Sequence, residues 1–308
     1  MTVVAETNEG ATTPSARPRH LIVTVYGLYG RSDRGWLPIA ALIRLLADLG
    51  VDEAAVRSAI SRLKRRGMLQ ARRHEGQAGY ELSAEALDIL REGDARIFRP
   101  DRATLADGWL LAVFSVPESE RHRRHVLRSE LTRLGFGMAA PGVWIVPARP
   151  YDATADVLRR LGLDAYADLF RADHLAFGDV AEKVRQWWDL DELQRQYEQF
   201  LRAHEASLRR WQHDSPGTSN QDADANRAAF ADYLRALTDW RRLPYLDPGL
   251  PAELLPDDWI GIRAAETFFA LRSLLSEPAR AYVGHVITGR LAPRHPGSPP
   301  RPRHPTIG

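Results

Sequence analysis

The stretch from Val51 to Leu69 reads VDEAAVRSAISRLKRRGML, and it decides the fold of the first third of the chain. Asp52 is a favourable N-cap residue, and Gly67 suits the position just beyond a helix end. The spacing between them predicts an amphipathic helix, because apolar residues recur at three and four positions apart. The residues of this predicted core face are Val56, Ala59, Ile60 and Leu63.

The remaining faces of this predicted helix are cationic and polar, which is the division that a DNA recognition helix needs. An arginine guanidinium can pair with guanine O6 and N7, and serines can reach bases or phosphates. Arginines beyond the helix end are placed to meet backbone phosphates. The alternative is an ordinary helix with a solvated basic face. The candidate DNA-binding residues are Arg57, Ser58, Ser61, Arg62, Lys64, Arg65, Arg66, Arg72 and Arg73.

The segments on either side of this predicted helix favour DNA binding over an ordinary helix with a solvated basic face. A helix is predicted from Pro38 to Gly50, and another follows the capping residue Ser83 as far as about Phe98. Residues 69–74 and 80–82 flank the polar, glycine-containing connection 75–79 and predict a hairpin. Residues 20–29 are apolar and predict either a strand or a buried helix. This order predicts a winged helix-turn-helix domain.

The charge distribution supports an anionic partner for this domain. The whole chain carries 42 basic and 40 acidic side chains, a net charge of +2. Between Ala16 and Arg102 there are 16 basic and 11 acidic side chains, a net charge of +5. A basic N-terminal third on a nearly neutral body indicates nucleic acid as the first candidate partner.

Several function classes find no support in the sequence. Cysteine is absent, so disulfides and thiolate chemistry are excluded, and no phosphate-binding loop or HExxH motif occurs. No apolar run is long enough to span a membrane, and residues 1–17 predict a disordered leader rather than a signal peptide. His122 and His125 lie three apart, but the arginines around them oppose a metal ion. We therefore expect a cytoplasmic protein that is not an enzyme and has no cofactor, metal or membrane partner.

The middle and the end of the chain differ in the secondary structure that their sequences predict. From about Gly108, the predicted order of elements is strand, helix, strand, strand, helix, strand, which is typical of a ferredoxin-like domain. Asp152 is the predicted cap of its second helix, and residues 168–177 are its predicted last strand. After it, we expect one long helix over 187–211, a polar loop over 214–225, and helices over 227–242 and 257–285. The tryptophans indicate packing, with an aromatic-ligand pocket as the alternative. The predicted class is α+β multidomain, with domains at 18–104, 105–178 (dimerisation) and 179–291 and a disordered Pro/Arg-rich tail at 292–308.

Three stretches of the chain together resemble one family, the PaaX-type transcriptional regulators. The first is the opening stretch, with its VRSAISRLKRRG core. The second joins DGWLLAVFSVPE (107–118) with LGFGMAAPGVWIVP (134–147), and the third is RRLPYLDPGLPAELLPDDWIGIRAAETFF (241–269). The resemblance covers residues from about 18 to 285, and the three stretches occur in the same order as in the family.

The resemblance implies a homodimeric repressor that binds double-stranded operator DNA of an operon for aromatic-acid catabolism. It also implies that an acyl-CoA thioester, such as phenylacetyl-CoA, releases the repressor from this DNA. An activator, or a regulator without such a ligand, stays open. Arginines must meet the phosphates of CoA, and the candidates outside the DNA-binding domain are Arg121, Arg123 and Arg124.

The middle domain is also similar to a small CRISPR-associated nuclease with an aspartate after its first strand. Ser115 stands at that position here, and a serine does not bind a divalent cation as a carboxylate does. A ferredoxin-like nuclease is therefore the less favoured alternative.

Overall fold

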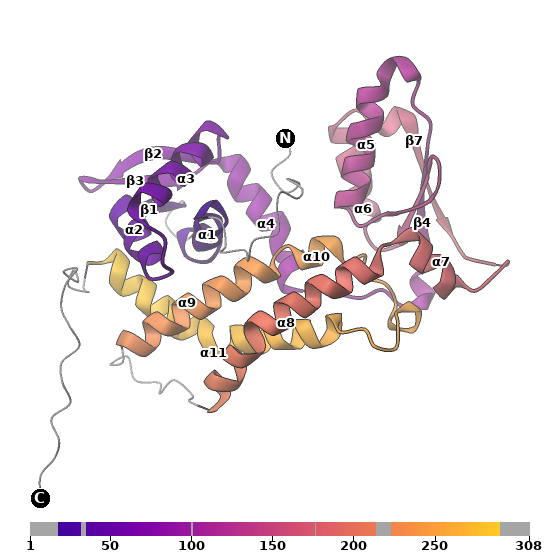
Figure 1. The fold of residues 1–308 in the computed structure, drawn as a ribbon. Coiled ribbons are helices and arrows are strands. Elements are labelled where there is room, and N and C mark those ends of the chain that lie inside the picture. Colours follow the sequence, from indigo (N-terminus) through magenta and orange to yellow (C-terminus); the bar gives the residue numbers. More distant parts are fainter. Residues whose placement is uncertain (1–17, 32–34, 100, 176, 214–222, 290–308) are drawn as a thin grey trace, which may run out of the picture.

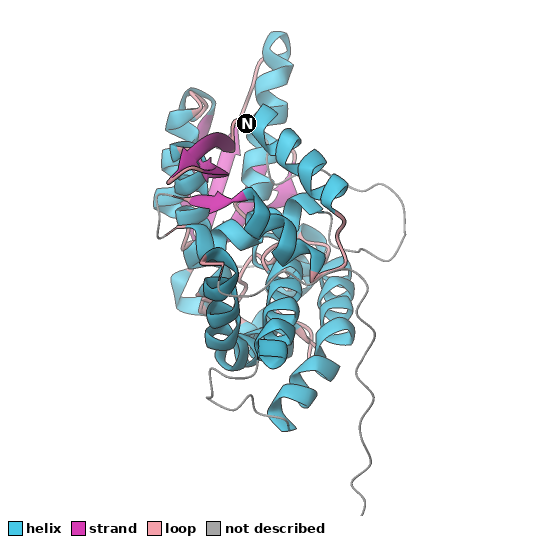
Figure 2. Ribbon diagram, turned by 90° about the vertical axis from the view of Figure 1, so that its left-hand side faces the viewer, coloured by secondary structure: helices cyan, strands magenta, loops and turns pink. Residues whose placement is uncertain are grey.

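The computed structural model describes residues 18–31, 35–99, 101–175, 177–213 and 223–289. The segments expected to form a leader (1–17) and a tail (292–308) lie outside these described residues, as does most of the expected polar loop. Figure 1 shows two lobes above a base of three long helices: α8 (Leu190–His213), α9 (Ala223–Trp240) and α11 (Gly261–Ile287). In the view turned by 90°, the strands likewise lie above these helices (Figure 2).

The apolar segment near residue 20 is a buried helix rather than a strand. It forms α1 (Pro18–Val25) and continues through one wider turn over Tyr26–Gly30. Ile22 and Val25 are fully buried, because α1 lies between α3 of its own lobe and α9 of the base. Helix was one of the two alternatives that the sequence left open, and burial on several sides explains why periodicity did not separate them.

The first lobe contains the helices and the hairpin predicted from its sequence, and it adds a short third strand. The sheet order is β1-β3-β2, all antiparallel. The predicted five-residue connection in the hairpin is wrong. β3 begins at Gln77, so Glu75 and Gly76 alone make the turn. The elements are β1 (Trp36–Pro38), α2 (Ile39–Ala47), α3 (Glu53–Arg65), β2 (Leu69–His74), β3 (Gln77–Leu82) and α4 (Ala84–Phe98).

The middle lobe follows the predicted alternation of strands and helices. Its four antiparallel strands run in the order β5-β6-β4-β7. Leu127 and Leu131 of α5 and Leu158 of α6 pack on one face of this sheet and form its core. The elements are β4 (Trp109–Phe114), α5 (Arg121–Arg133), β5 (Gly137–Ala140), β6 (Val143–Pro147), α6 (Tyr151–Arg160) and β7 (Ala167–Ala172).

Two boundary predictions in the middle lobe are wrong. Asp152 does not cap a helix: α6 begins at Tyr151 after Pro150, and Thr154 donates its hydroxyl to the Pro150 carbonyl at 2.7 Å. The last strand ends at Ala172, because its ladder with β4 ends where β4 begins at Trp109.

The single long helix expected over residues 187–211 is also wrong. The structure has α7 (Val180–Trp187) and α8, separated by Trp188 and Asp189. Trp188 takes an extended conformation (φ −129°, ψ 143°), and its indole Nε1 donates to the Gly135 carbonyl at 2.9 Å. Docking of this side chain on the middle lobe interrupts the helix. Asp189 then accepts a hydrogen bond from the Glu192 amide at the start of α8.

The first lobe and the helical base share one hydrophobic core, whereas the middle lobe has one core of its own. A third cluster joins Trp109 and Ile145 of the middle lobe to Leu190 of α8 and to Leu254. Polar contacts also join the first lobe to the base: the Thr238 hydroxyl donates to Thr24 at 2.9 Å, and Tyr282 donates to Asp48. Two indoles lie deep in these cores, Trp240 on α9 and Trp144 on β6. No helix among the described residues combines the length and apolar character that a membrane span requires.

Candidate nucleic-acid interface and interdomain cavity

Helix α3 is fixed by its cap and by its apolar face. The Asp52 carboxylate accepts a hydrogen bond from the Ala55 amide at 2.8 Å, and Gly67 follows the helix with a positive φ of 72°. The predicted core face is confirmed, because all of its members are buried. Since that face packs on α1 and α2, the opposite face of α3 points away from the protein core. The buried residues are Val56, Ala59, Ile60 and Leu63.

All nine candidate DNA-binding side chains lie at the surface of the first lobe, and we call this set the basic face. Seven follow one another on α3 and at its end, and Arg72 and Arg73 lie on the exposed strand β2. Nothing in this set is used for the hydrophobic core, so the structure leaves it available to a partner. The members are Arg57, Ser58, Ser61, Arg62, Lys64, Arg65, Arg66, Arg72 and Arg73.

Several of these side chains have weak, local partners. Arg57 pairs with Glu53 one turn earlier at 2.7 Å, with both side chains more than half exposed. Arg65 donates to the Ser61 hydroxyl at 3.0 Å, and Arg72 pairs with Glu81 at 2.7 Å. Exposed pairs of this kind contribute little stability and are readily exchanged for a phosphate.

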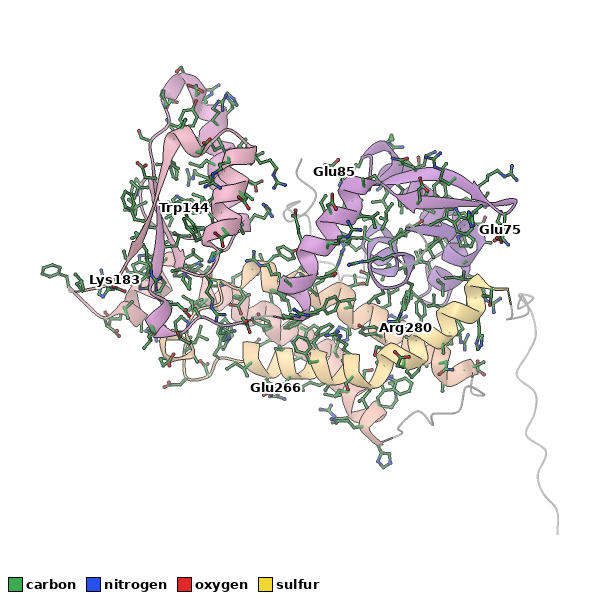
Figure 3. The ribbon with its side chains drawn as sticks, turned by 180° about the vertical axis from the view of Figure 1, so that it is seen from behind. Glu75, Glu85, Trp144, Lys183, Glu266 and Arg280 are labelled. Atoms are coloured by element: carbon green, nitrogen blue, oxygen red, sulfur yellow. The ribbon has the colours of Figure 1, made fainter. Side chains whose placement is uncertain are left out.

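The hairpin extends beyond α3 with a tight turn at its tip. Glu75 (φ 47°) and Gly76 (φ 81°) both have positive φ, as a two-residue turn between twisted strands requires. Figure 3 shows Glu75 at the end of this lobe, far from Trp144 in the middle lobe. At its base, the hairpin packs tightly on β1, where a side chain at Gly79 would collide with Trp36. The strands that carry Arg72 and Arg73 are thereby held in a defined position.

The arginines predicted to meet an effector lie at the start of α5. Arg123 pairs with Glu120 at 2.9 Å and donates to the Gly162 carbonyl, and Arg124 pairs with Glu118 at 2.9 Å. The third of these arginines, Arg121, is exposed. The structure brings this group together at the start of one helix, and none of its members lines the interdomain cavity described below. His122 and His125 are exposed nearby, and no cluster of three metal-ligating side chains occurs among the described residues.

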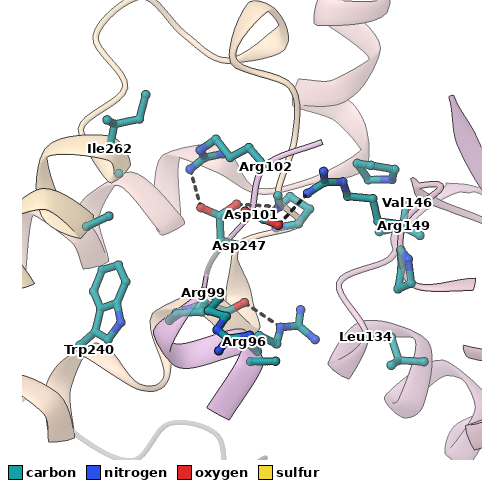
Figure 4. Close-up of a pocket in the computed structure, with 18 of the residues that line it drawn as sticks. Arg96, Arg99, Asp101, Arg102, Leu134, Val146, Arg149, Trp240, Asp247 and Ile262 are labelled. Carbon is teal, nitrogen blue, oxygen red and sulfur yellow. Dashed lines mark hydrogen bonds and ion pairs between the residues drawn. The ribbon is translucent and has the colours of Figure 1, made fainter. Parts of the chain in front are cut away.

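A cavity of about 820 Å³ lies where the two lobes and the helical base meet (Figure 4). Its wall combines the end of α4, the linker after it, the end of β6 and helices α8, α9 and α11. Four arginines and two aspartates line it, together with apolar groups that include Trp240 and Val146. Sequence reasoning missed this site. Its charged residues are Arg96, Arg99, Asp101, Arg102, Arg149 and Asp247.

The acidic groups of the cavity are already engaged. Asp247 pairs with Arg102 at 2.8 Å and also accepts hydrogen bonds from the Tyr197 hydroxyl and the Gly249 amide, both at 2.8 Å. Burial raises the pKa of Tyr197 further above that of a free phenol, and the Asp247 charge adds to the shift, so the phenol stays a donor. Asp101 lies 3.8 Å from Arg149, a separation typical of a loose surface pair.

Arg96 joins all three parts of the molecule. Its Nε donates at 2.9 Å to the Pro244 carbonyl on the short helix α10 (Leu243–Leu246), which connects α9 to the rest of the base. Its Nη1 donates to the Arg133 carbonyl of the middle lobe at 3.2 Å. Both partners are neutral, and burial lowers the pKa of its guanidinium. The positive charge of Arg96 is therefore held by dipoles rather than by a carboxylate.

Comparisons with known families agree with this division of the chain. The model of the PaaX-like protein matches residues 17–86, the model of the PaaX protein central Cas2-like domain matches residues 102–184, and the model of the PaaX-like protein C-terminal domain matches residues 188–285. The three matches are consecutive and cover most of the described residues.

Two individual proteins extend the similarity over most of the chain. The chain is 28% identical over 282 residues to the transcriptional repressor PaaX of Escherichia coli (strain K12), covering 88% of this chain and 85% of that protein. It is also similar in fold to the uncharacterized protein Rv0674 from Mycobacterium tuberculosis, with a TM-score of 0.54 and 24% identity over 85% of this chain and 97% of that one. With three consecutive domain matches and a relative aligned along nearly its full length, the chain belongs to the PaaX-type family of transcriptional regulators.

Proposed function

We propose that the chain is a transcriptional repressor that binds operator DNA through the basic face. The first lobe supplies a helix, a tight turn, a second helix and a hairpin, which is the arrangement of a winged helix-turn-helix. The observation that carries the proposal is the division of α3: one face is fully buried and the other presents nine exposed polar or cationic side chains with the hairpin. Such a helix can enter the major groove without disturbing its own core.

The roles within the basic face differ. Arg57 and Arg62 lie in the body of α3, where a guanidinium can reach base edges. Arg72 and Arg73 lie on β2, where they suit phosphate contacts along the flanking backbone. Specificity should therefore depend on α3, and general affinity on the hairpin.

The proposed functional unit is a homodimer formed through the middle lobe. The strand order β5-β6-β4-β7 is that of a ferredoxin-like sheet, and α5 and α6 cover one of its faces. On the opposite face, Val113 of β4 and Phe170 of β7 are exposed on adjacent strands, and Leu175 and Phe177 extend the apolar surface beyond β7. A second copy would bury this surface. Phe170→Arg should give a monomer in analytical ultracentrifugation.

The proposed effector is an acyl-CoA thioester, with phenylacetyl-CoA as the first compound to test and an aromatic-acid catabolic operon as the target. The similarity to the E. coli transcriptional repressor supports repression here. Two groups of arginines are candidates for contact with the CoA phosphates: the group predicted from the sequence, Arg121, Arg123 and Arg124, and the arginines of the interdomain cavity. An activator, or a regulator without an acyl-CoA ligand, is the alternative.

We propose no enzymatic role. The position after β4 that carries an aspartate in the similar nuclease is occupied by Ser115, whose backbone amide donates to the Tyr166 carbonyl at 3.0 Å. Metal-dependent cleavage of DNA or RNA by the purified chain, lost on substitution in the middle lobe, would instead establish the ferredoxin-like nuclease.

The test is fluorescence anisotropy with the DNA upstream of the gene for this chain, titrated with several acyl-CoAs. Tight binding that one thioester abolishes is the expected result. Tight binding that no thioester disturbs would support the regulator without an acyl-CoA ligand. Equal affinity for the upstream DNA and for unrelated DNA would contradict operator recognition.

A further inference from the structure

We propose that the interdomain cavity is the binding site of an anionic small molecule with an apolar arm, and that this molecule controls how the first lobe sits on the rest of the chain. The expected effect on DNA binding rests on the proposed function, whereas the binding site is inferred from the shape and charge of the cavity alone. At about 820 Å³, its volume falls in the range typical of small-molecule sites.

The charge of the cavity wall selects an anion. Four arginines face two aspartates in the wall, and one of those aspartates already accepts three hydrogen bonds. Arg149 also pairs with Asp107, outside the wall, at 3.5 Å. Arg96 contacts only neutral carbonyls through the hydrogen bonds described above. The Arg99 side chain is exposed and forms no hydrogen bond or ion pair with the described residues. A carboxylate or phosphate would satisfy these cations with charge-assisted hydrogen bonds.

A neighbouring phenol does not neutralise this charge. The Tyr245 ring lies 5.0 Å from the Arg96 guanidinium, stacked beneath it. Burial raises the pKa of Tyr245 above the ordinary phenol value, so the group is uncharged at neutral pH. The wall therefore keeps an excess of positive charge in a partly enclosed, low-dielectric space, where an anion is attracted more strongly than at an open surface.

The rest of the wall selects an apolar arm. Trp240, Leu134 and Val146 border the cavity but are almost fully buried. Ile262 is half exposed and presents an apolar surface that a ligand can reach. Such a mixture of few polar groups and a mostly apolar wall is typical of sites for small organic anions. A bare inorganic ion would leave this apolar surface in water.

The position of the cavity links ligand binding to DNA binding. Arg96 lies on α4 of the first lobe, and Arg99 directly follows that helix. Arg149 follows β6 of the middle lobe, and Asp247 lies in the segment that connects α9 to α11 of the base. An anion that draws these groups together would change the spacing between the basic face and the middle lobe. By linkage, DNA and ligand must then weaken each other's binding by the same factor.

The test is isothermal titration calorimetry of the full chain with phenylacetyl-CoA, CoA and phenylacetate. CoA carries the phosphates without the acyl arm and phenylacetate carries a carboxylate with the ring, so the two together identify the anionic group that the arginines bind. Three proteins are compared: the wild type, the cavity double variant Arg99→Glu/Arg149→Glu and the matched double variant Arg121→Glu/Arg123→Glu on α5. A fourth, Ile262→Trp, fills the cavity without changing its charge.

We expect wild-type binding of at least one probe, a Kd about tenfold or more higher in the cavity double variant and in Ile262→Trp, and a change of less than about twofold in the α5 variant. Circular dichroism and melting should be unchanged in all four proteins. Unchanged affinity in both cavity variants, or no binding of any probe at about 1 mM, would overturn the inference. Operator anisotropy on the same preparations separates the outcomes, because failure of this site leaves specific DNA binding intact.

Discussion

The basic face and the interdomain cavity are both built from arginine, yet they differ in almost every other respect. The basic face comes from one continuous segment, 57–73, and all of its members are exposed. The cavity collects its arginines from α4, the linker after it and the loop after β6. The comparison shows two uses of the same side chain: an open array for a long polyanion, and an enclosed group for one small anion.

The surroundings explain the different chemistry. Exposed guanidinium groups remain hydrated, hold their local partners weakly and bind DNA largely through the release of counterions. Guanidinium groups in the cavity are partly desolvated and hold the lobes together, as Arg96 does through two backbone carbonyls. Substitutions in the basic face should therefore alter binding without altering stability, whereas substitution of a cavity arginine that joins the lobes, such as Arg96, should alter both.

The largest expected effect is the salt dependence of operator binding. If a dimer neutralises about 6–10 phosphates, its affinity should fall by roughly 10³–10⁵ between about 50 and 200 mM salt. Anisotropy titrations at a series of salt concentrations measure the slope. A slope close to zero would contradict the assignment of the basic face, whereas Arg99→Glu should leave the slope unchanged.

The next effect is on stability, at the cavity. Asp247→Ala removes the acceptor of Arg102, Tyr197 and the Gly249 amide, and should lower the free energy of unfolding by roughly 3 kcal/mol, because it leaves a partly buried cation unpaired. Urea denaturation measures the change. Asp88→Ala is the matched control, since Asp88 pairs with Arg91 at an exposed site and its loss should cost less than about 0.5 kcal/mol. Equal losses at the two positions would remove the distinction between cavity and surface.

A smaller effect is expected at Arg57. Arg57→Ala should reduce discrimination between operator and unrelated DNA by about 1–3 kcal/mol if this residue reads a base, with stability unchanged within about 0.5 kcal/mol. Arg202→Ala is a matched control, because Arg202 also pairs with a glutamate one turn earlier on an exposed helix face. A uniform loss on all DNA sequences would make Arg57 a phosphate contact.

The smallest effect is at the cap of α3. Asp52→Ala removes the hydrogen bond to the Ala55 amide and should destabilise the protein by about 1 kcal/mol. Operator affinity should fall only slightly at temperatures where the chain stays folded. Thermal melting and anisotropy on the same sample separate the two contributions. A large loss of affinity in a fully folded variant would show that Asp52 contributes to the interface itself.

The sequence predicts most strongly where neighbouring residues decide the structure. Asp52, the apolar face of α3 and Gly67 specify a helix locally, and the structure has it within one residue of the predicted bounds. The predictions that fail depend on distant contacts. The helix break at Trp188 follows from its docking against Gly135, which lies 53 residues earlier in the chain.

The same limit explains why the cavity was missed. Its arginines are far apart in the sequence, and none of them belongs to a recognisable motif. The effector candidates Arg121, Arg123 and Arg124 are neighbours in the sequence, whereas the arginines of the cavity come from separate parts of the fold. Adjacent arginines on one helix end commonly pair with nearby carboxylates, as Arg123 and Arg124 do with Glu120 and Glu118.

The central claim, that the basic face recognises operator DNA, is tested most directly by one anisotropy experiment. The wild-type chain and the variant Arg57→Ala/Arg62→Ala are titrated against the DNA upstream of the gene for this chain and against a shuffled sequence of equal length. We expect the wild type to prefer the upstream DNA strongly and the variant to bind both DNAs almost equally. A variant that keeps the full wild-type preference would contradict the claim.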